Sequence, residues 1–460
     1  MAKRTSLHGH WSSRLAFILA VSGSAVGLGN IWKFPYVAGV NGGGAFVLFY
    51  LLCVALIGLP IMMAEILIGR RGRRNPVATM RIVGEEEGSR PSWALVGVMG
   101  VIAGIIILSF YSVIAGWSLA YIGHAALNRF AGGGAAEINA LFGNLQADWR
   151  LLAVWHSIFM VLTIFVVARG VERGLERAVR FLMPALAVLM VALLGYAVIN
   201  GDFRTGLTFL LEPDFSQLSA DGMLAALGQA FFSLSIGMGA IMAYGAYLPE
   251  GTSIANTSIS VVLADTAMAL LAGLAIFPIV FAHGLDPAAG PGLIFQTLPL
   301  AFGNMAGGHL FGTLFFVLLT FAAWTSSIGL IEPAVAWSVE THGRSRVFSA
   351  VVIGLIVWAL GFLTLLSFNE LENFKLLGRT LFENLDHLSS NILLPLGGVF
   401  ITIFAGWVMC KNSTAEELDI GTGAIYHQWR FLARWVAPAA VLLVFLHATG
   451  LLRVFGLAGP

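Results

Sequence analysis

The sequence Gly23-Ser24-Ala25-Val26-Gly27-Leu28-Gly29-Asn30 stands in the middle of an apolar run over residues 12–37. Glycine costs about 1 kcal/mol relative to alanine at an interior helix position, so this stretch weakens a helix there. A similar stretch, Phe232-Ser233-Leu234-Ser235-Ile236-Gly237-Met238-Gly239, interrupts a later apolar run over 223–249. The two stretches predict helices that are broken part-way along their length.

The composition around these stretches is that of a membrane protein. Of 460 residues, 58% are hydrophobic and 11% are charged, whereas soluble domains carry about 25% charged residues. So few charges cannot cover a water-exposed surface, so we expect lipid to cover most of it. The net charge of +1 does not indicate a nucleic-acid partner. The two cysteines, Cys53 and Cys410, predict neither a disulfide framework nor a metal cluster.

About eleven segments are apolar and long enough to span a bilayer, which requires roughly 20 residues. Their approximate limits are 12–37, 42–69, 93–124, 151–169, 178–200, 223–249, 255–284, 310–339, 346–368, 385–409 and 431–452. The connections 125–150, 201–222 and 285–309 are rich in Gly, Pro and small residues, and none is long enough for a second domain. We therefore expect an all-α polytopic protein with one membrane domain over residues 1–460.

The two weakened helices are the first and the sixth of this series. Unwound backbone is tolerated inside a bilayer only where it faces a cavity or other protein, and its carbonyls and helix ends can bind ions. Two sets of five helices, each opening with a broken helix, are typical of an inverted repeat with a central site. We expect repeats at about 12–200 and 223–409, followed by an eleventh helix at 431–452. The alternative is close packing of small residues of the Gly-xxx-Gly kind.

Positive charge predicts the orientation, because cytoplasmic loops are enriched in Lys and Arg. With the N-terminus in the cytoplasm, 18 of the 25 Lys and Arg residues fall on the cytoplasmic side. We therefore expect a multi-pass protein of a bacterial or archaeal cytoplasmic (inner) membrane, with its C-terminus outside.

Several stretches resemble one family, the neurotransmitter:sodium symporters, in their bacterial amino-acid branch. The matching residues are 23–36 (GSAVGLGNIWKFPY), 41–46 (NGGGAF), 229–240 (QAFFSLSIGMGA) and 325–328 (TSSI), and they follow the family order. The resemblance implies a sodium-coupled symporter that imports amino acids by alternating access. It implies a monomer or weak dimer with no nucleic-acid partner.

The resemblance implies two sodium sites made of oxygen ligands, which hard cations prefer. The first site would use Ala25, Asn30, Ser233 and Asp265, completed by the substrate carboxylate. The second would use Gly23, Val26, Ala322, Thr325 and Ser326. Without the resemblance, Thr325-Ser326-Ser327 could equally be helix hydroxyls that bond to the preceding turn.

Asp265 is also informative by itself, because a carboxylate within a span is costly and indicates function by default. Many relatives carry Asn at this position and need chloride or a nearby Glu as a compensating negative charge. The position that holds that Glu in some relatives is Ala269 here. We therefore expect Asp265 to supply the negative charge, and transport to have no chloride requirement.

The resemblance implies that position 27 faces the substrate. Because Gly27 supplies no acidic side chain to pair with a bare amine, the ligand should bring its own carboxylate, which Tyr111 would bind. The predicted substrate-binding residues are Ala25, Gly27, Gly29, Ile107, Tyr111, Phe232, Ser233, Ser235, Met238, Ser326 and Leu330. No charged group faces the substrate side chain, and flexible Met238 fits varied shapes. We expect aliphatic and aromatic L-amino acids, unless Tyr111 and Phe232 are merely core aromatics.

Gate residues follow from the same resemblance. Lys33 and Asp386 correspond to an outer Arg–Asp pair, although Lys cannot make the bidentate contact of Arg. Glu340 and Tyr247 correspond to an inner acid and its supporting tyrosine. The family Arg that pairs with this acid is replaced by His8, so the inner cation could be His8, His10 or Arg4.

Other functions remain open at this stage. A proton-coupled or exchange-type amino-acid carrier of the same five-plus-five fold would share the broken helices but not the sodium residues. An enzyme is not indicated, since no HExxH motif, Cys/His cluster or nucleotide loop is present. A channel is the remaining alternative.

Overall fold

The computed structural model describes residues 4–290 and 292–448, and over this part of the chain it is helical with no β-strand. Serine side chains begin several of the long helices. Ser13, Ser219, Ser253 and Ser345 each accept a hydrogen bond from the backbone N–H three residues further on. This N-capping satisfies a donor that the first helical turn leaves free.

Nine continuous helical stretches of the described chain are long and apolar enough to cross a membrane, and the bent first helix makes ten. Some stretches contain a short π-helical turn, labelled η. The first four of the nine continuous stretches are α3 (Gly44–Cys53) with η2 (Val54–Gly58) and α4 (Leu59–Gly72), α6 (Ala94–Ala126) after a 3₁₀ turn η3 (Pro91–Trp93), α8 (Trp149–Ala168), and η4 (Val171–Glu176) with α9 (Arg177–Asn200). The next three are α13 (Ile254–Ala282), α15 (Gly308–His342) and α16 (Arg346–Leu366). The last two are α17 (Leu381–Asp386) with η6 (His387–Leu393), α18 (Leu394–Ile403) and η7 (Phe404–Val408), and α20 (Ala424–Phe431) with η8 (Leu432–Val436) and α21 (Ala437–Ala448).

The first and sixth helices are broken as predicted. The first consists of α1 (Arg14–Ala25) and η1 (Gly29–Lys33) with α2 (Phe34–Val40), and its two halves meet at a bend of 50°. The sixth consists of α11 (Ala220–Ser233) and α12 (Ala240–Ala246), separated by Leu234–Gly239. Neither half is long enough to span a bilayer alone. The nine or ten long apolar helices agree with most of the eleven predicted segments, and α11 with α12 corresponds to the predicted segment 223–249. Residues 449–452 of the last predicted segment, and the predicted position of the C-terminus, lie outside the described residues.

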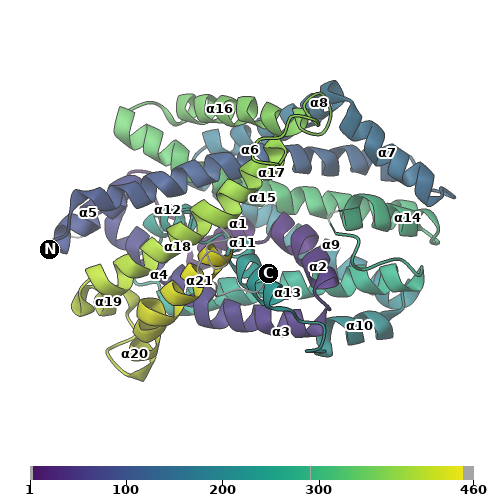
Figure 1. Ribbon diagram of the computed structural model, residues 1–460. Helices are drawn as coiled ribbons and strands as arrows, with labels where there is room; N and C mark the ends of the chain where they lie inside the picture. Colours follow the sequence, from purple (N-terminus) through teal and green to yellow (C-terminus); the bar gives the residue numbers. More distant parts are fainter. Residues whose placement is uncertain (1–3, 291, 449–460) are drawn as a thin grey trace.

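Short helices occupy the two ends of the bundle. At the end where the described N-terminal residues lie are α5 (Pro76–Glu86), α19 (Lys411–Leu418) and α20. At the opposite end are α7 (Ala135–Ala147), α10 (Phe203–Leu211) and η5 (Leu293–Thr297) with α14 (Leu298–Gly303), so the predicted connections contain helices (Figure 1).

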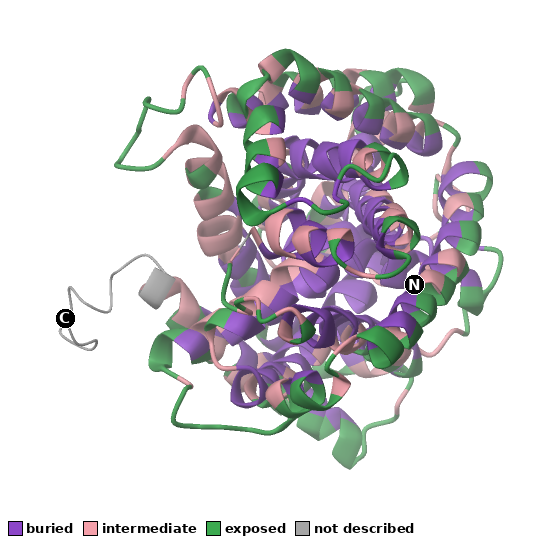
Figure 2. Ribbon diagram, turned by 90° about the vertical axis from the view of Figure 1, so that its right-hand side faces the viewer, coloured by how far each residue is buried: buried purple, intermediate pink, exposed green. Residues whose placement is uncertain are grey.

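The interior is closely packed around the long helices α6 and α15, which run against each other. Buried residues gather in the centre, and the outer helices carry the exposed ones (Figure 2). Many exposed side chains are large and apolar, including Phe181, Val188 and Ile199 on α9. A wide exposed apolar surface of this kind is typical of contact with lipid.

Candidate functional site

The break in the first helix leaves backbone groups free in the protein interior. Val26 has an extended backbone (ψ 100°), and the next N–H groups bond to side chains instead of to a helical turn. The Asn30 amide oxygen accepts from Gly27 N–H at 3.2 Å, and the Tyr111 hydroxyl lies 3.2 Å from Leu28 N–H. The unwound segment is therefore held by two side chains that the sequence analysis assigns to the site.

The break in the sixth helix depends on three residues with a left-handed backbone. Ser235, Gly237 and Gly239 have φ values of 54°, 89° and 74°, a region that favours glycine. Glu65, which is fully buried on α4, accepts a hydrogen bond of 2.6 Å from Gly237 N–H. A carboxylate from a neighbouring helix thus satisfies an N–H that the broken helix leaves unpaired.

The two breaks are also bonded to each other. Ser235 donates its hydroxyl to the Ser24 carbonyl at 3.1 Å, and the Gln229 amide donates to the Gly29 carbonyl at 2.7 Å. Gln229, the first residue of the 229–240 stretch that resembles the family, therefore bonds to the break of the first helix.

Two of the four residues predicted for the first sodium site, Asn30 and Asp265, bond to each other. Asn30 donates its amide N–H to the Asp265 carboxylate at 2.8 Å and to the Asp265 carbonyl at 3.1 Å. Ser233 Oγ lies 3.1 Å from the Tyr50 hydroxyl. Asp265 is fully buried, and its second carboxylate oxygen has no hydrogen-bond partner among the described residues. A buried carboxylate oxygen is costly unless a charge compensates it, so this donor set fits a bound cation.

The residues predicted for the second sodium site lie where α1 meets α15. Ser326 Oγ is 3.4 Å from the Gly23 carbonyl and 3.3 Å from the Val26 carbonyl. Thr325 Oγ is 3.0 Å from the Ala322 carbonyl. Five uncharged oxygen groups on two helices are a ligand set that suits an alkali cation.

A cavity between the two breaks gathers ten of the eleven residues predicted to contact substrate. Ser233 is the exception, and Leu394 of α18 is an additional lining residue. The full lining is Ala25, Gly27, Gly29, Ile107, Tyr111, Phe232, Ser235, Met238, Ser326, Leu330 and Leu394. No lining side chain is charged. The position of Leu394 follows from packing of the tenth helix against the sixth, which no local sequence signal reveals.

This cavity is almost closed in the present conformation. Its volume is about 20 Å³, which is about the space that a single water molecule needs. An amino acid could enter only if lining side chains such as Phe232 and Met238 moved. The site is thus preformed in its backbone and closed by its side chains.

One end of the site shows a difference from the predicted gate. We expected Lys33 to pair with Asp386, but the structure has no ion pair between them. The Lys33 ammonium lies 4.0 Å from the centre of the Phe232 ring, and Asp386 accepts from the Ser390 hydroxyl at 2.9 Å. The ammonium of Lys is a point charge without the fork of Arg, and the face of an aromatic ring attracts it.

The other end has the predicted acid with several partners. Glu340 lies 2.9 Å from His8 Nε2 and accepts from the backbone and side-chain N–H groups of Asn75 at 2.9 and 2.7 Å. Tyr247, which we expected to support Glu340, instead donates to Glu332 at 2.9 Å. Its backbone carbonyl accepts from Trp11 N–H at 3.0 Å, so Tyr247 still contacts the N-terminal segment.

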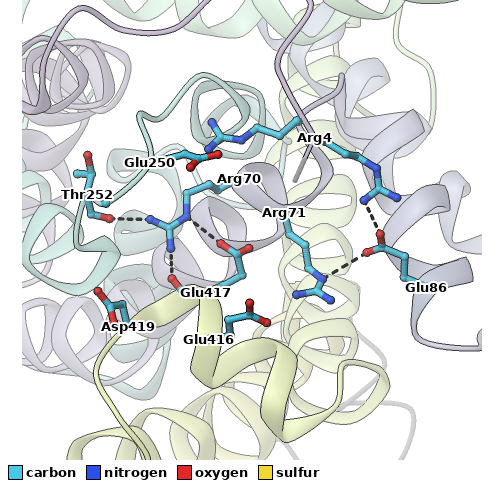
Figure 3. A pocket seen from close by; sticks show the side chains of 11 residues that line it. Arg4, Arg70, Arg71, Glu86, Glu250, Thr252, Glu416, Glu417 and Asp419 are labelled. Carbon is cyan, nitrogen blue, oxygen red and sulfur yellow. Dashed lines mark hydrogen bonds and ion pairs between the residues drawn. The ribbon is translucent and has the colours of Figure 1, made fainter. Parts of the chain in front are cut away.

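A larger cavity of about 380 Å³ lies at the same end of the bundle, at the surface. Its lining is charged, and Figure 3 shows Arg70 bonded to Glu417 and Thr252, with Arg4 and Arg71 both directed at Glu86. Three of its four arginines pair with Glu86 or Glu417, and its lining shares no residue with that of the neutral central cavity.

The model of one family, the sodium:neurotransmitter symporter family, matches residues 8–131 and 136–454. This chain belongs to that family. The family is one of membrane transporters, which confirms the predicted resemblance, the multi-pass membrane fold and the absence of an enzymatic function.

Relatives of the chain extend over nearly its whole length. An uncharacterized sodium-dependent transporter of Bacillus subtilis, YhdH, is 39% identical over 96% of this chain and 98% of its own. The sodium-dependent nutrient amino acid transporter 1 of Drosophila erecta is 24% identical over 97% of this chain and 78% of its own. Among solved structures, MhsT in complex with L-phenylalanine is 42% identical, with a TM-score of 0.89, over 96% of this chain and 99% of the other. The symporter described here is thus a sodium-dependent membrane transporter.

Proposed function

We propose that this symporter couples inward sodium movement to the import of hydrophobic L-amino acids, both aliphatic and aromatic. The observation that supports this most strongly is the neutral cavity between the two helix breaks, with the unpaired oxygen of Asp265 in the adjacent ligand set. A charged substrate side chain would lose its hydration there without a partner. The related MhsT structure holds L-phenylalanine.

The recognition of the substrate backbone follows from the same geometry. Tyr111, bonded to the first break, would donate to a substrate carboxylate. Carbonyls of the sixth-helix break around Phe232 and Ser235 would accept from the substrate ammonium. A side chain at position 27 would occupy the space proposed for the substrate backbone, since a Cβ there would lie 2.8 Å from the Tyr111 hydroxyl. This supports an amino acid, which carries its own carboxylate, over a bare amine.

Two sodium ions would accompany the substrate. Ala25, Asn30, Ser233 and Asp265 would hold the first ion, and Gly23, Val26, Ala322, Thr325 and Ser326 the second. Bound sodium supplies positive charge next to the substrate carboxylate, so each ligand stabilises the other. Asp265 would provide the compensating negative charge, since Ala269 one turn later on α13 carries none; transport would then need no chloride.

Alternating access would be controlled at both ends. We place the end that carries the N-terminus in the cytoplasm of a bacterial or archaeal cell, and the C-terminus outside. His8, Glu340 and Tyr247 would close the cytoplasmic end, and Lys33 over Phe232 the external end, with Asp386 nearby on α17. The transporter would work as a monomer or weak dimer.

A sodium-dependent stability screen tests this proposal. Purified protein with a panel of twenty amino acids should gain thermal stability from Leu, Ile, Phe, Tyr or Trp in sodium but not in potassium. A ligand at 100 times its dissociation constant stabilises the folded state by about 2.7 kcal/mol. If the same ligands stabilise equally in potassium, the proton-coupled or exchange alternative is favoured. If only charged or small polar amino acids raise the thermal stability, the proposed substrate class is wrong.

A further inference from the structure

The N-terminal segment is held at three points by carboxylates from three different elements. Arg4 pairs with Glu86 of α5 at 2.5 Å, His8 lies 2.9 Å from Glu340 at the end of α15, and Ser12 bonds to Glu176 of η4. The Arg4–Glu86 contact is visible in Figure 3. Of these three contacts, the family resemblance suggests only the one between His8 and Glu340.

The contact at Glu176 uses both carboxylate oxygens and lies next to the start of α1. Its carboxylate accepts from Ser12 N–H at 2.9 Å, from the Ser12 hydroxyl at 2.5 Å and from the Arg180 guanidinium at 2.7 Å. The Glu176 side chain is 6% exposed, whereas those of Arg4 and Glu86 are 31% and 14% exposed. Charge-assisted hydrogen bonds of a buried group are strong, while exposed ion pairs contribute little.

The position of Ser12 links this contact to the ion sites. The next residue, Ser13, is the N-cap of α1 and accepts from Ala16 N–H at 3.2 Å. A helix of 12 residues extends about 18 Å, and α1 carries Gly23 and Ala25 at its far end. Glu176 therefore fixes the start of α1, and the other end of this helix supplies proposed sodium ligands.

We propose that Glu176 is a positioning residue for the inner half of the first helix. It holds α1 against η4 and α9 in the closed conformation of the N-terminal end, and its release from Ser12 accompanies opening of that end. The inference rests on the proposed sodium-coupled function. Because sodium ligands on α1 are in place only while α1 is docked, weakening the contact shifts the population and lowers the apparent sodium affinity.

Hydrogen–deuterium exchange and sodium titration of the Glu176→Gln variant test this inference. The amide keeps the size of the side chain but brings an NH₂ group against donors. We expect faster exchange over residues 11–25 in potassium and an apparent sodium dissociation constant raised about tenfold, with transport at saturating sodium largely kept. A tenfold change corresponds to 1.4 kcal/mol.

Two further variants distinguish the positioning of α1 by Glu176 from a general effect of lost charge or lost folding. Glu172→Gln removes the same charge from an exposed position of the same turn and should change neither readout. Ser12→Ala should reproduce part of the effect from the other partner, and the double variant with Glu176→Gln should show little additional loss. Unchanged exchange over 11–25 in Glu176→Gln, or equal effects of Glu172→Gln, would overturn the inference.

Failure of the proposed function gives a different result. If sodium does not stabilise the unaltered protein, the coupling proposal fails, whereas the exchange comparison in potassium still measures whether Glu176 docks α1. Exchange that is unaltered in Glu176→Gln rejects the positioning role even if sodium binding is intact.

Discussion

Gly27 has no space for a side chain. A Cβ at this position would clash with Ser326 Oγ and lie 2.8 Å from the Tyr111 hydroxyl. We expect Gly27→Ala to abolish substrate-induced stabilisation while the protein still folds, measured by thermal shift with and without L-phenylalanine in sodium. Gly143→Ala on exposed α7, where a Cβ meets nothing within 4 Å, is the matched control. Normal binding by Gly27→Ala would contradict the position of the site.

Asp265 is the only acid among the proposed ion ligands within the described chain. Replacing it by Asn removes the fixed negative charge that would balance sodium. We expect uptake by Asp265→Asn to fall at least tenfold in gluconate medium and to recover in part in chloride. The unaltered protein should transport equally in both media. Abolished uptake of the unaltered protein in gluconate would show that chloride is needed.

At the scale of the helix, the break in the sixth span depends on glycine backbone conformation. Gly237 has φ +89°, and an added Cβ would lie 2.5 Å from the Leu394 carbonyl. Backbone strain of this kind costs about 1–3 kcal/mol, so Gly237→Ala should lower the melting temperature and transport together. Gly228→Ala, within α11 and with open space around it, should leave both unchanged or raise the melting temperature. A fully stable, active Gly237→Ala protein would show that the break tolerates other conformations.

For the whole molecule, the balance between inward-closed and inward-open states depends on the N-terminal end. Around His8 lie Glu340 and the Tyr247 ring, whose centre is 5.7 Å away. The imidazole of His8 contacts the Glu340 carboxylate, so removing this ring should favour opening of the N-terminal end. We expect amide exchange over residues 8–25 to be faster in His8→Ala than in the unaltered protein. His8→Arg, which keeps a donor for Glu340, should exchange as slowly as the unaltered protein. Exchange that is unchanged in His8→Ala would reject His8 as the partner that closes this end.

The sequence by itself determined the membrane class, the long apolar helices and the two breaks. These properties follow from local composition: long apolar runs need lipid, and clusters of glycine and hydroxyl residues cannot continue a helix. With the family resemblance, it also predicted nearly all residues that line the cavity. It did not predict Leu394, because that contact joins helices ten and six.

Tertiary structure alone decided which charged and polar groups pair. Lys33 lies over Phe232 instead of reaching Asp386, Tyr247 bonds to Glu332 instead of Glu340, and Glu176 anchors Ser12. The partner of a side chain depends on how helices from distant parts of the chain pack, and several partners of similar chemistry compete at each end of the bundle. Local patterns specify where a helix breaks, whereas packing specifies what the freed groups bind.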